Sequence, residues 1–341
     1  MVGTGRFSFA SLRVPIVAAP MAGGPSTPEL VAAVTEAGGF GYLSSGNLTP
    51  ERMIGDVERT RGAGTFGVNV FVPADLPPAT GAVERYRSLL LAEATRYGVE
   101  LAMPPAGDTD FYAQKVAWLV EHPVAVVSFT FGLPSTALVE QLHEGGTHVA
   151  ATVTDAAEAR AAASIGADSL VVQGTIAGGH RGNHSVFATP NETRLEDLLY
   201  QVRAVTDLPI VAAGGASGAR IVREYLDVAI AVQAGTAFLL ADEAGTSLVQ
   251  RQAMVSGQFT ETTVTRAFTG RFARGLRNRF IDEHTADAPP GYPEINLLTR
   301  PIRQAAAAAG DPSAMSLWAG TGFALAEAKP AAEIVRSLDP S

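Results

Sequence analysis

The sequence predicts an α/β protein: a (β/α)8 TIM barrel with a small, mostly helical cap domain. Short apolar runs alternate with Ala-rich, helix-forming segments along most of the 341 residues. The apolar runs are continuous, as in parallel strands that are buried on both faces. Eight strand–helix units are the number that closes such a barrel. A doubly wound open sheet is the competing architecture, but it normally has a Gly-rich turn after its first strand, and here the Gly-rich turns come late.

Eight segments have the strand pattern. They are residues 15–20, 40–43, 66–72, 125–129, 148–153, 169–173, 210–215 and 229–239. Helices are predicted at residues 26–39, 134–144, 154–168 and 217–226. Ser26 or Thr27 can cap the first of these helices, and Glu29 can complete a capping box with Ser26. Thr154 is the expected cap of the third.

Two regions are longer than a bare barrel requires. Residues 73–122 form an extended connection with a predicted helix near 82–97. Residues 246–318 form a longer, partly Pro-rich segment that we expect to cover one end of the barrel. The predicted division is a barrel at 1–245, a cap or substrate segment at 246–318, and a C-terminal helix at 319–341 that returns to the barrel.

The composition excludes several classes of protein. The net charge of −9 makes a nucleic-acid or membrane-surface partner improbable. The chain has no cysteine, which rules out disulfides, thiolate catalysis and cysteine-based metal sites, and we predict no metal. Neither a signal peptide nor an apolar run of membrane-spanning length is recognised. We expect a soluble cytoplasmic protein, monomeric or homodimeric.

Three Gly-rich loops follow predicted strands, where barrel enzymes carry their function. Gly178–Gly179 follows the sixth strand, Gly214–Gly215 the seventh, and Gly235–Thr236 the eighth. Backbone N–H groups of such loops bind phosphate in many barrels, and glycine allows a phosphate to approach closely. One such pair alone is usually a tight turn, but the three together predict a phosphate-bearing ligand.

The remaining polar loop residues indicate which ligand this is. The amides of Asn69, Gln173 and Gln233 suit a heteroaromatic ring or a polyol, and the small residues 19–23 can lie flat against a ring. One phosphate, a polyol and a planar ring are the parts of FMN. A Schiff-base aldolase would need a lysine at a strand end, and the sequence places none there. The predicted FMN-binding residues are Ala19, Pro20, Met21, Ala22, Gly23, Asn69, Ser128, Gln173, Gly178, Gly179, Ala213, Gly214, Gly215, Gln233, Ala234, Gly235 and Thr236.

His180 follows the first glycine pair and is the candidate catalytic residue. Imidazole titrates near neutral pH, so it can act as a base, a cation or a hydrogen-bond donor. An isolated loop histidine is more often an ordinary loop residue, and that alternative stays open. His184 lies in the same stretch, and we expect it to sit further from the ligand.

Several motifs, in this order along the chain, resemble the nitronate monooxygenases, formerly called 2-nitropropane dioxygenases. They are PIVAAPMAGG, GVNVFV, SFTFG, VVQG with AGGHRG, IVAAGG, QAGTAF, GRFARGLRNRF and SLWAGTG. The resemblance extends from about Pro15 to about Leu338. It implies an FMN-binding barrel with a small second domain, in which His180 is catalytic. The superfamily also contains flavin-type enoyl-acyl-carrier-protein reductases and trans-acting enoyl reductases of polyketide pathways.

Two positions depart from the pattern of that family. Ile176 stands where the family has Glu, and Thr321 stands where it has Gln. We expect the family glutamate to order the loop or to tune the histidine, so Ile176 should leave the surroundings of His180 drier. These departures bear on the substrate more than on FMN.

The resemblance implies an FMN-dependent nitronate monooxygenase. Such an enzyme oxidises an alkyl nitronate or another small anion with O2 to a carbonyl compound and nitrite, through a flavin semiquinone. We expect His180 to hold the anion as a cation or hydrogen-bond donor, rather than to act as a base on a neutral nitroalkane. The alternatives are an NAD(P)H-dependent enoyl reductase and a non-catalytic flavin-binding member of a biosynthetic pathway.

Overall fold

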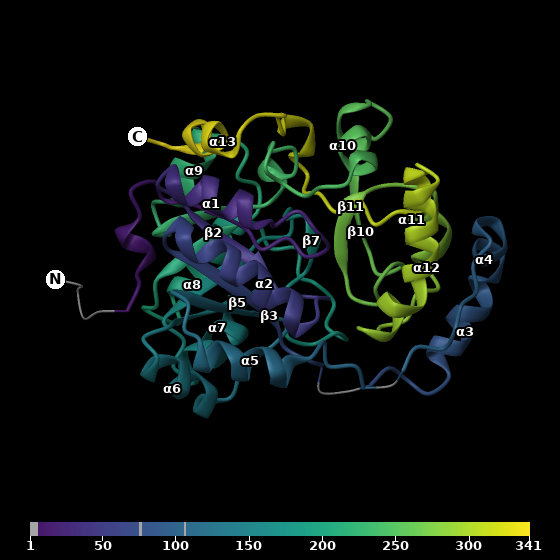
Figure 1. The fold of residues 1–341 in the computed structure, drawn as a ribbon, viewed down its shortest axis with the longest axis horizontal. Helices are drawn as coiled ribbons and strands as arrows, with labels where there is room; N and C mark the ends of the chain where they lie inside the picture. Colours follow the sequence, from purple (N-terminus) through teal and green to yellow (C-terminus); the bar gives the residue numbers. More distant parts are fainter. Residues whose placement is uncertain (1–5, 75–76, 106) are drawn as a thin grey trace.

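The computed structural model describes residues 6–74, 77–105 and 107–341, and it confirms the barrel (Figure 1). Eight parallel strands close on themselves, because β9 pairs with β1 and places Val232 opposite Ile16. A doubly wound open sheet is therefore excluded. The barrel strands are β1 (Ile16–Ala18), β2 (Phe40–Ser44), β3 (Phe66–Phe71), β4 (Val126–Thr130), β5 (His148–Val153), β6 (Ser169–Gln173), β8 (Ile210–Ala213) and β9 (Ala231–Ala234).

The last predicted strand is too long. β9 ends at Ala234, and the apolar residues after Gly235 form a 3-10 turn, η3 (Thr236–Phe238), with Phe238 fully buried. The apolar run continues because this turn packs into the core, and burial alone does not distinguish a strand from a buried turn.

Helices cover the outside of the barrel. They are α1 (Pro28–Glu36), α2 (Pro50–Thr60) with η2 (Arg61–Ala63), α5 (Tyr112–Glu121), α6 (Thr136–Glu144), α7 (Ala156–Ser164), α8 (Leu195–Arg203), α9 (Ala219–Tyr225) and α13 (Ala331–Leu338). Of the predicted caps, Thr27 is confirmed, whereas the capping box of Ser26 and the cap Thr154 are not observed. Thr27 caps α1 by accepting from the Leu30 N–H, while the Ser26 hydroxyl accepts from the Met21 N–H at 2.8 Å. Asp155, not Thr154, caps α7.

An aromatic plug closes the N-terminal end of the barrel. Phe9, in the turn η1 (Phe9–Ser11), packs edge-on against Phe40 with ring centroids 5.2 Å apart. Phe9 joins a buried cluster with Tyr42, Val126 and Val171. The alternate strand residues face the surrounding helices, as the twofold repeat of a barrel strand requires. The plugged end leaves room for a cavity only at the opposite, C-terminal end of the strands.

The cap contains a small sheet that the sequence analysis does not predict. β10 (Thr262–Thr265) and β11 (Ala273–Leu276) pair antiparallel, and β11 also pairs with β7 (Gly179–His180). The loop that follows β6 therefore supplies the third strand of the cap sheet. The helical parts are α10 (Leu248–Val255), α11 (Arg279–His284), α12 (Glu294–Ala308) and η4 (Pro312–Ala314).

Part of the connection at 73–122 packs on the cap (Figure 1). The predicted helix at 82–97 is two helices, α3 (Ala82–Leu89) and α4 (Leu91–Tyr97), which meet at Leu90 and contact α12. The predicted C-terminal helix at 319–341 is also shorter than expected. Only α13 is α-helical there, and the preceding residues contain the turn η5 (Phe323–Leu325).

Among the described residues, no helix combines the length and the apolar character needed to cross a bilayer.

Candidate active site

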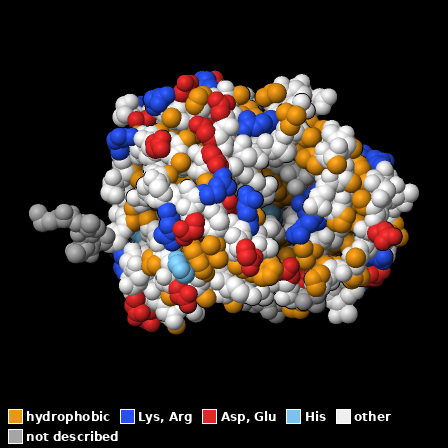
Figure 2. Space-filling model, viewed as in Figure 1, with side chains coloured by type: hydrophobic (Ala, Val, Ile, Leu, Met, Phe, Trp, Pro, Cys, Tyr) orange, Lys and Arg blue, Asp and Glu red, His pale blue; other side chains and the backbone are white. Residues whose placement is uncertain are grey.

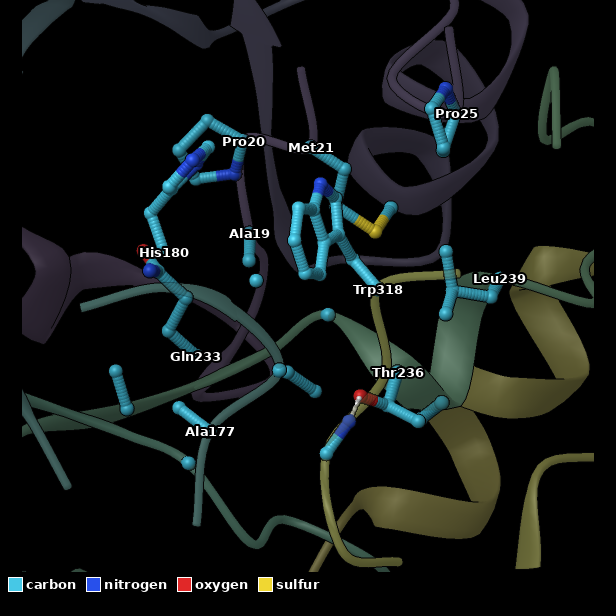
Figure 3. A pocket seen from close by; sticks show the side chains of 18 of the residues that line it. Ala19, Pro20, Met21, Pro25, Ala177, His180, Gln233, Thr236, Leu239 and Trp318 are labelled. Carbon is cyan, nitrogen blue, oxygen red and sulfur yellow. Dashed lines mark hydrogen bonds between the residues drawn. The ribbon is translucent and has the colours of Figure 1, made fainter. Parts of the chain in front are cut away.

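A cavity of about 550 Å³ opens at the C-terminal ends of the barrel strands, beneath the cap. This volume suits a cofactor with a small substrate beside it. We call its two sides the barrel wall, formed by the loops after β1, β6, β8 and β9, and the cap wall. The cap wall consists of Thr269, Asn296, Arg303, Ser316 and Trp318. Figure 3 shows Met21, Gln233 and Thr236 of the barrel wall around the same space as Trp318.

The structure brings the sequence-predicted residues together, with one exception. All of them except Ser128 line the cavity. Ser128 is buried one layer below, where its hydroxyl accepts a hydrogen bond from the Asn69 Nδ2 at 2.9 Å. Thr130 accepts from the same nitrogen at 3.0 Å. Ser128 and Thr130 therefore orient Asn69, whose Oδ1 stays available as an acceptor.

The two glutamines of the barrel wall differ in their hydrogen bonds. The Gln173 side chain holds its own loop, because its Nε2 donates to the His180 carbonyl at 2.9 Å and its Oε1 accepts from the Gly182 N–H at 2.8 Å. Gln233 Oε1 is buried and has no hydrogen-bond partner among the described residues. Such an atom is costly to bury, so it marks a place where a ligand N–H fits.

The backbone conformation and the packing of the barrel wall require glycine at several positions, whether or not a ligand is bound. Gly179, Gly214 and Gly215 have φ angles of +74°, +115° and +75°, which side-chain-bearing residues rarely adopt. A Cβ on Gly178 would lie 2.5 Å from the backbone nitrogen of Gly320. The expected close approach of a phosphate is therefore not the sole reason for glycine at these positions.

The two departures from the family pattern lie side by side. The Thr321 N–H donates to the Ile176 carbonyl at 3.2 Å. The Ile176 side chain lies against Gly215, since a Cβ on Gly215 would meet Ile176 Cδ1 at 2.5 Å, and the Tyr225 hydroxyl lies 3.0 Å from the same point. The expectation that position 176 affects the surroundings of His180 stays a prediction.

His180 sits in an aromatic box under the cap. Its ring lies 5.5 Å from those of Phe131 and Trp318 and 5.7 Å from that of Tyr292, measured between centroids. Burial, with the charges of Arg271 and Arg303, lowers the pKa of His180 from 6.5 to about 3. This lowered pKa favours a neutral His180 at neutral pH over the expected cation.

Thr269 lies within hydrogen-bond distance of both His180 Nε2 and the Arg271 carbonyl. The buried Thr269 hydroxyl donates to the Arg271 carbonyl at 3.1 Å, and its oxygen lies 2.9 Å from His180 Nε2. A hydroxyl has one proton, and a carbonyl can only accept. When the Thr269 proton points to the Arg271 carbonyl, Thr269 accepts from Nε2–H and the lone pair of the neutral ring is on Nδ1. His184 does not line the cavity, and its Nε2 contacts the Thr152 carbonyl at 3.0 Å.

Sequence reasoning missed most of the cap wall. Trp318 belongs to a motif that resembles the family, but Thr269, Asn296 and Arg303 carry no local signal. They reach the cavity only because the cap folds over the barrel. Among the described residues one group has metal-ligand spacing, Glu93 with Glu283 and His284; it is not part of the cavity lining, and Arg279 already pairs with Glu93 at 2.6 and 2.8 Å.

Comparisons with known proteins agree with this architecture. Residues 7–340 match the family model described as nitronate monooxygenase. A probable nitronate monooxygenase of Staphylococcus aureus (strain MSSA476) is 34% identical over 337 residues, which cover 96% of this chain and 94% of that protein. The structure of nitroalkane oxidase from Streptomyces ansochromogenes superposes with a TM-score of 0.91 at 44% identity, covering 97% of this chain and 96% of that one. FabK from Thermotoga maritima gives 0.74 at 25% identity, covering 97% and 93%. The chain belongs to the nitronate monooxygenase family and is an oxidoreductase of that type.

Proposed function

We propose that the chain is an FMN-dependent nitronate monooxygenase that converts alkyl nitronates and O2 into carbonyl compounds and nitrite. Two nitronates and one O2 give two carbonyl compounds and two nitrite ions, which balances atoms and charge. The observation that carries the proposal is the cavity itself. Glycine loops and the buried Gln233 Oε1, which has no partner among the described residues, line the barrel wall. His180, whose lowered pKa favours the neutral ring, lies beside the cap wall.

The residues of the barrel wall fit FMN. The buried Gln233 Oε1, which lacks a partner among the described residues, suits an N–H of a heteroaromatic ring. The Thr236 oxygen accepts from the Gly320 N–H at 2.9 Å, so its hydroxyl proton is free to donate to a phosphate (Figure 3). Gly214 and Gly215 add backbone N–H groups. FMN bound here supplies the electron acceptor for the oxidation.

His180 and the three aromatic side chains around it have different roles in the proposed reaction. The unprotonated Nδ1 of His180 can take a proton from the carbon of a neutral nitroalkane, while a nitronate arrives already deprotonated. The geometry permits a base, but a pKa of about 3 makes that base weak at neutral pH, so the His180→Asn variant has to distinguish it from the hydrogen-bond donor that the sequence analysis expects. Phe131, Tyr292 and Trp318 surround the ring and exclude water from it.

The test uses the purified protein. Acid precipitation should release FMN, and addition of ethyl nitronate should cause oxygen uptake with nitrite formation. Rapid bleaching of the flavin by NADPH, without oxygen uptake on nitronate, would favour the enoyl reductase instead. A folded protein that holds no flavin and takes up no added FMN would refute the proposal.

A further inference from the structure

The cavity lining is almost free of charge. Among the described lining residues, Arg303 and Glu327 carry the formal charges. Glu327 lies on the C-terminal segment and already pairs with Lys329 at 2.7 Å. Arg303 lies on α12, in the cap wall. Figure 2 shows a hollow in the face between barrel and cap, with Lys or Arg side chains at its rim.

Hydrogen bonds hold the Arg303 guanidinium in place, but they do not occupy all of its N–H groups. Its Nη2 donates to the Asn296 carbonyl at 2.7 Å and to Asn296 Oδ1 at 2.8 Å, and its Nε donates to Thr299 at 3.2 Å. Nη1 has one long contact, 3.5 Å to the Ser316 hydroxyl. Since a guanidinium has five N–H groups, at least one on Nη1 has no partner among the described residues, and Arg303 lines the cavity.

Arg303 has no carboxylate within salt-bridge distance in the described parts of the chain. Burial and the charge of Arg300 lower the pKa of Arg303 to about 10, so it is still protonated at neutral pH. Arg271, whose charge also acts on His180, lies over the Phe131 ring at 4.2 Å. A buried cation without a counter-ion is unfavourable, and a bound anion offsets that cost.

We propose that Arg303 is the anion-binding residue of the substrate site. It would bind the negatively charged oxygen of a planar oxyanion, which in the proposed reaction is the nitronate group; this inference rests on that function. Asn296 and Thr299 hold the guanidinium, and Nη1 donates the charge-assisted hydrogen bond. The positive charge near the substrate then comes from Arg303, while His180 stays neutral beside it.

The test measures anion binding to the FMN-loaded protein. Nitrate is the probe, because it is planar, anionic and not oxidised, and calorimetry gives its Kd. Loss of one charge-assisted hydrogen bond in Arg303→Gln should raise the nitrate Kd and the nitronate KM about tenfold to hundredfold. Arg300→Gln is the matched control, because it removes the same charge from the exposed side of α12 and should leave both values within about twofold.

A second variant separates binding from folding. Arg303→Lys keeps the charge without the planar fork, so it should bind nitrate more tightly than Arg303→Gln. FMN content and circular dichroism establish that each variant is folded. An unchanged nitrate Kd in Arg303→Gln would overturn the inference and leave the proposed function standing. Arg303-dependent nitrate binding in a wild-type protein that does not oxidise nitronates would support the anion site and refute the function.

Discussion

The barrel wall and the cap wall of the cavity differ in construction and in charge. The barrel wall consists of short loops at successive strand ends, and its ligand-facing groups are backbone N–H groups and amides. The cap wall assembles Thr269, Arg303 and Trp318 from distant parts of one segment. The first is suited to a cofactor with one phosphate and a neutral ring, and the second to a small anion. Under the proposed function, this division places cofactor binding on the barrel wall and substrate binding on the cap wall.

His180 belongs to both walls. It follows β6 of the barrel, but its strand β7 pairs with β11, which places His180 opposite Ala273 in the cap sheet. Arg274, the next residue of β11, donates to the Thr175 carbonyl at 3.1 Å and so fixes the same loop. The position of the histidine therefore depends on cap and barrel together.

The largest effect is expected from His180→Asn. If Nδ1 is the base, kcat/KM on a neutral nitroalkane should fall about 10²- to 10⁴-fold, the usual contribution of a general base. The loss on the pre-formed nitronate should be much smaller, because no C–H proton has to be removed. Steady-state oxygen uptake with nitroethane and ethyl nitronate measures both, and flavin content should not change. Equal losses on the two substrates would instead favour a hydrogen-bond donor.

Thr269→Val should have a smaller effect of the same kind. It removes the hydrogen bond to His180 Nε2 while keeping the side-chain shape, so kcat/KM on nitroethane should fall about tenfold, as for one hydrogen bond. Thr269→Ser, which keeps the hydroxyl, should restore the rate. The ¹⁵N resonances of His180 report the protonated nitrogen directly. A wild-type spectrum with the proton on Nδ1 would contradict the assigned tautomer.

The sequence predicts the barrel wall well for a physical reason. Continuous apolar runs identify buried strands, and a closed parallel barrel brings all their carboxyl ends to one rim. Asn69, Gln173 and Gln233 can therefore be placed near one another without knowledge of any contact between them. Ser128 is the exception, since β4 turns its side chain below the cavity toward Asn69. A motif alone does not give the direction of a side chain.

The cap wall could not be derived in the same way. Arg303 lies in the helix-forming stretch after a Pro-rich segment, and nothing local distinguishes it from the exposed Arg300. It reaches the cavity because α12 folds over the barrel, where Asn296 and Thr299 of the same helix hold its guanidinium. The neutral state of His180 has the same origin, because its pKa depends on burial and on two arginines supplied by the cap.

The kcat/KM on nitroethane should not change over the pH range in which an ordinary histidine titrates. With its pKa lowered to about 3, His180 is already unprotonated at pH 5, so kcat/KM on nitroethane should show no inflection near pH 6.5. The same pKa shift also sets how the contribution of His180 to folding stability depends on pH. The folded protein binds the proton less readily than the unfolded chain, so this histidine favours folding above pH 6.5, and its contribution is lost as the pH falls toward 3. An inflection near 6.5 that disappears in His180→Asn would show an exposed, titrating ring.

The smallest effect is expected from Ile176→Glu, and it separates the two walls most directly. The side chain lies against Gly215, on the barrel wall, and the Tyr225 hydroxyl is close to the same glycine. Burial raises the pKa of Tyr225 to about 12, so its hydroxyl is protonated and can donate to a new carboxylate. A carboxylate this close to the predicted phosphate loops should weaken FMN binding several-fold by like-charge repulsion, less so at high salt. The pH–rate profile on nitroethane should be the same as in wild type.

Ile176→Gln, equal in size but uncharged, is the control and should retain FMN as wild type does. A new inflection in the profile of Ile176→Glu that is absent from Ile176→Gln would show that position 176 acts on the histidine after all, and that the two walls are electrostatically coupled.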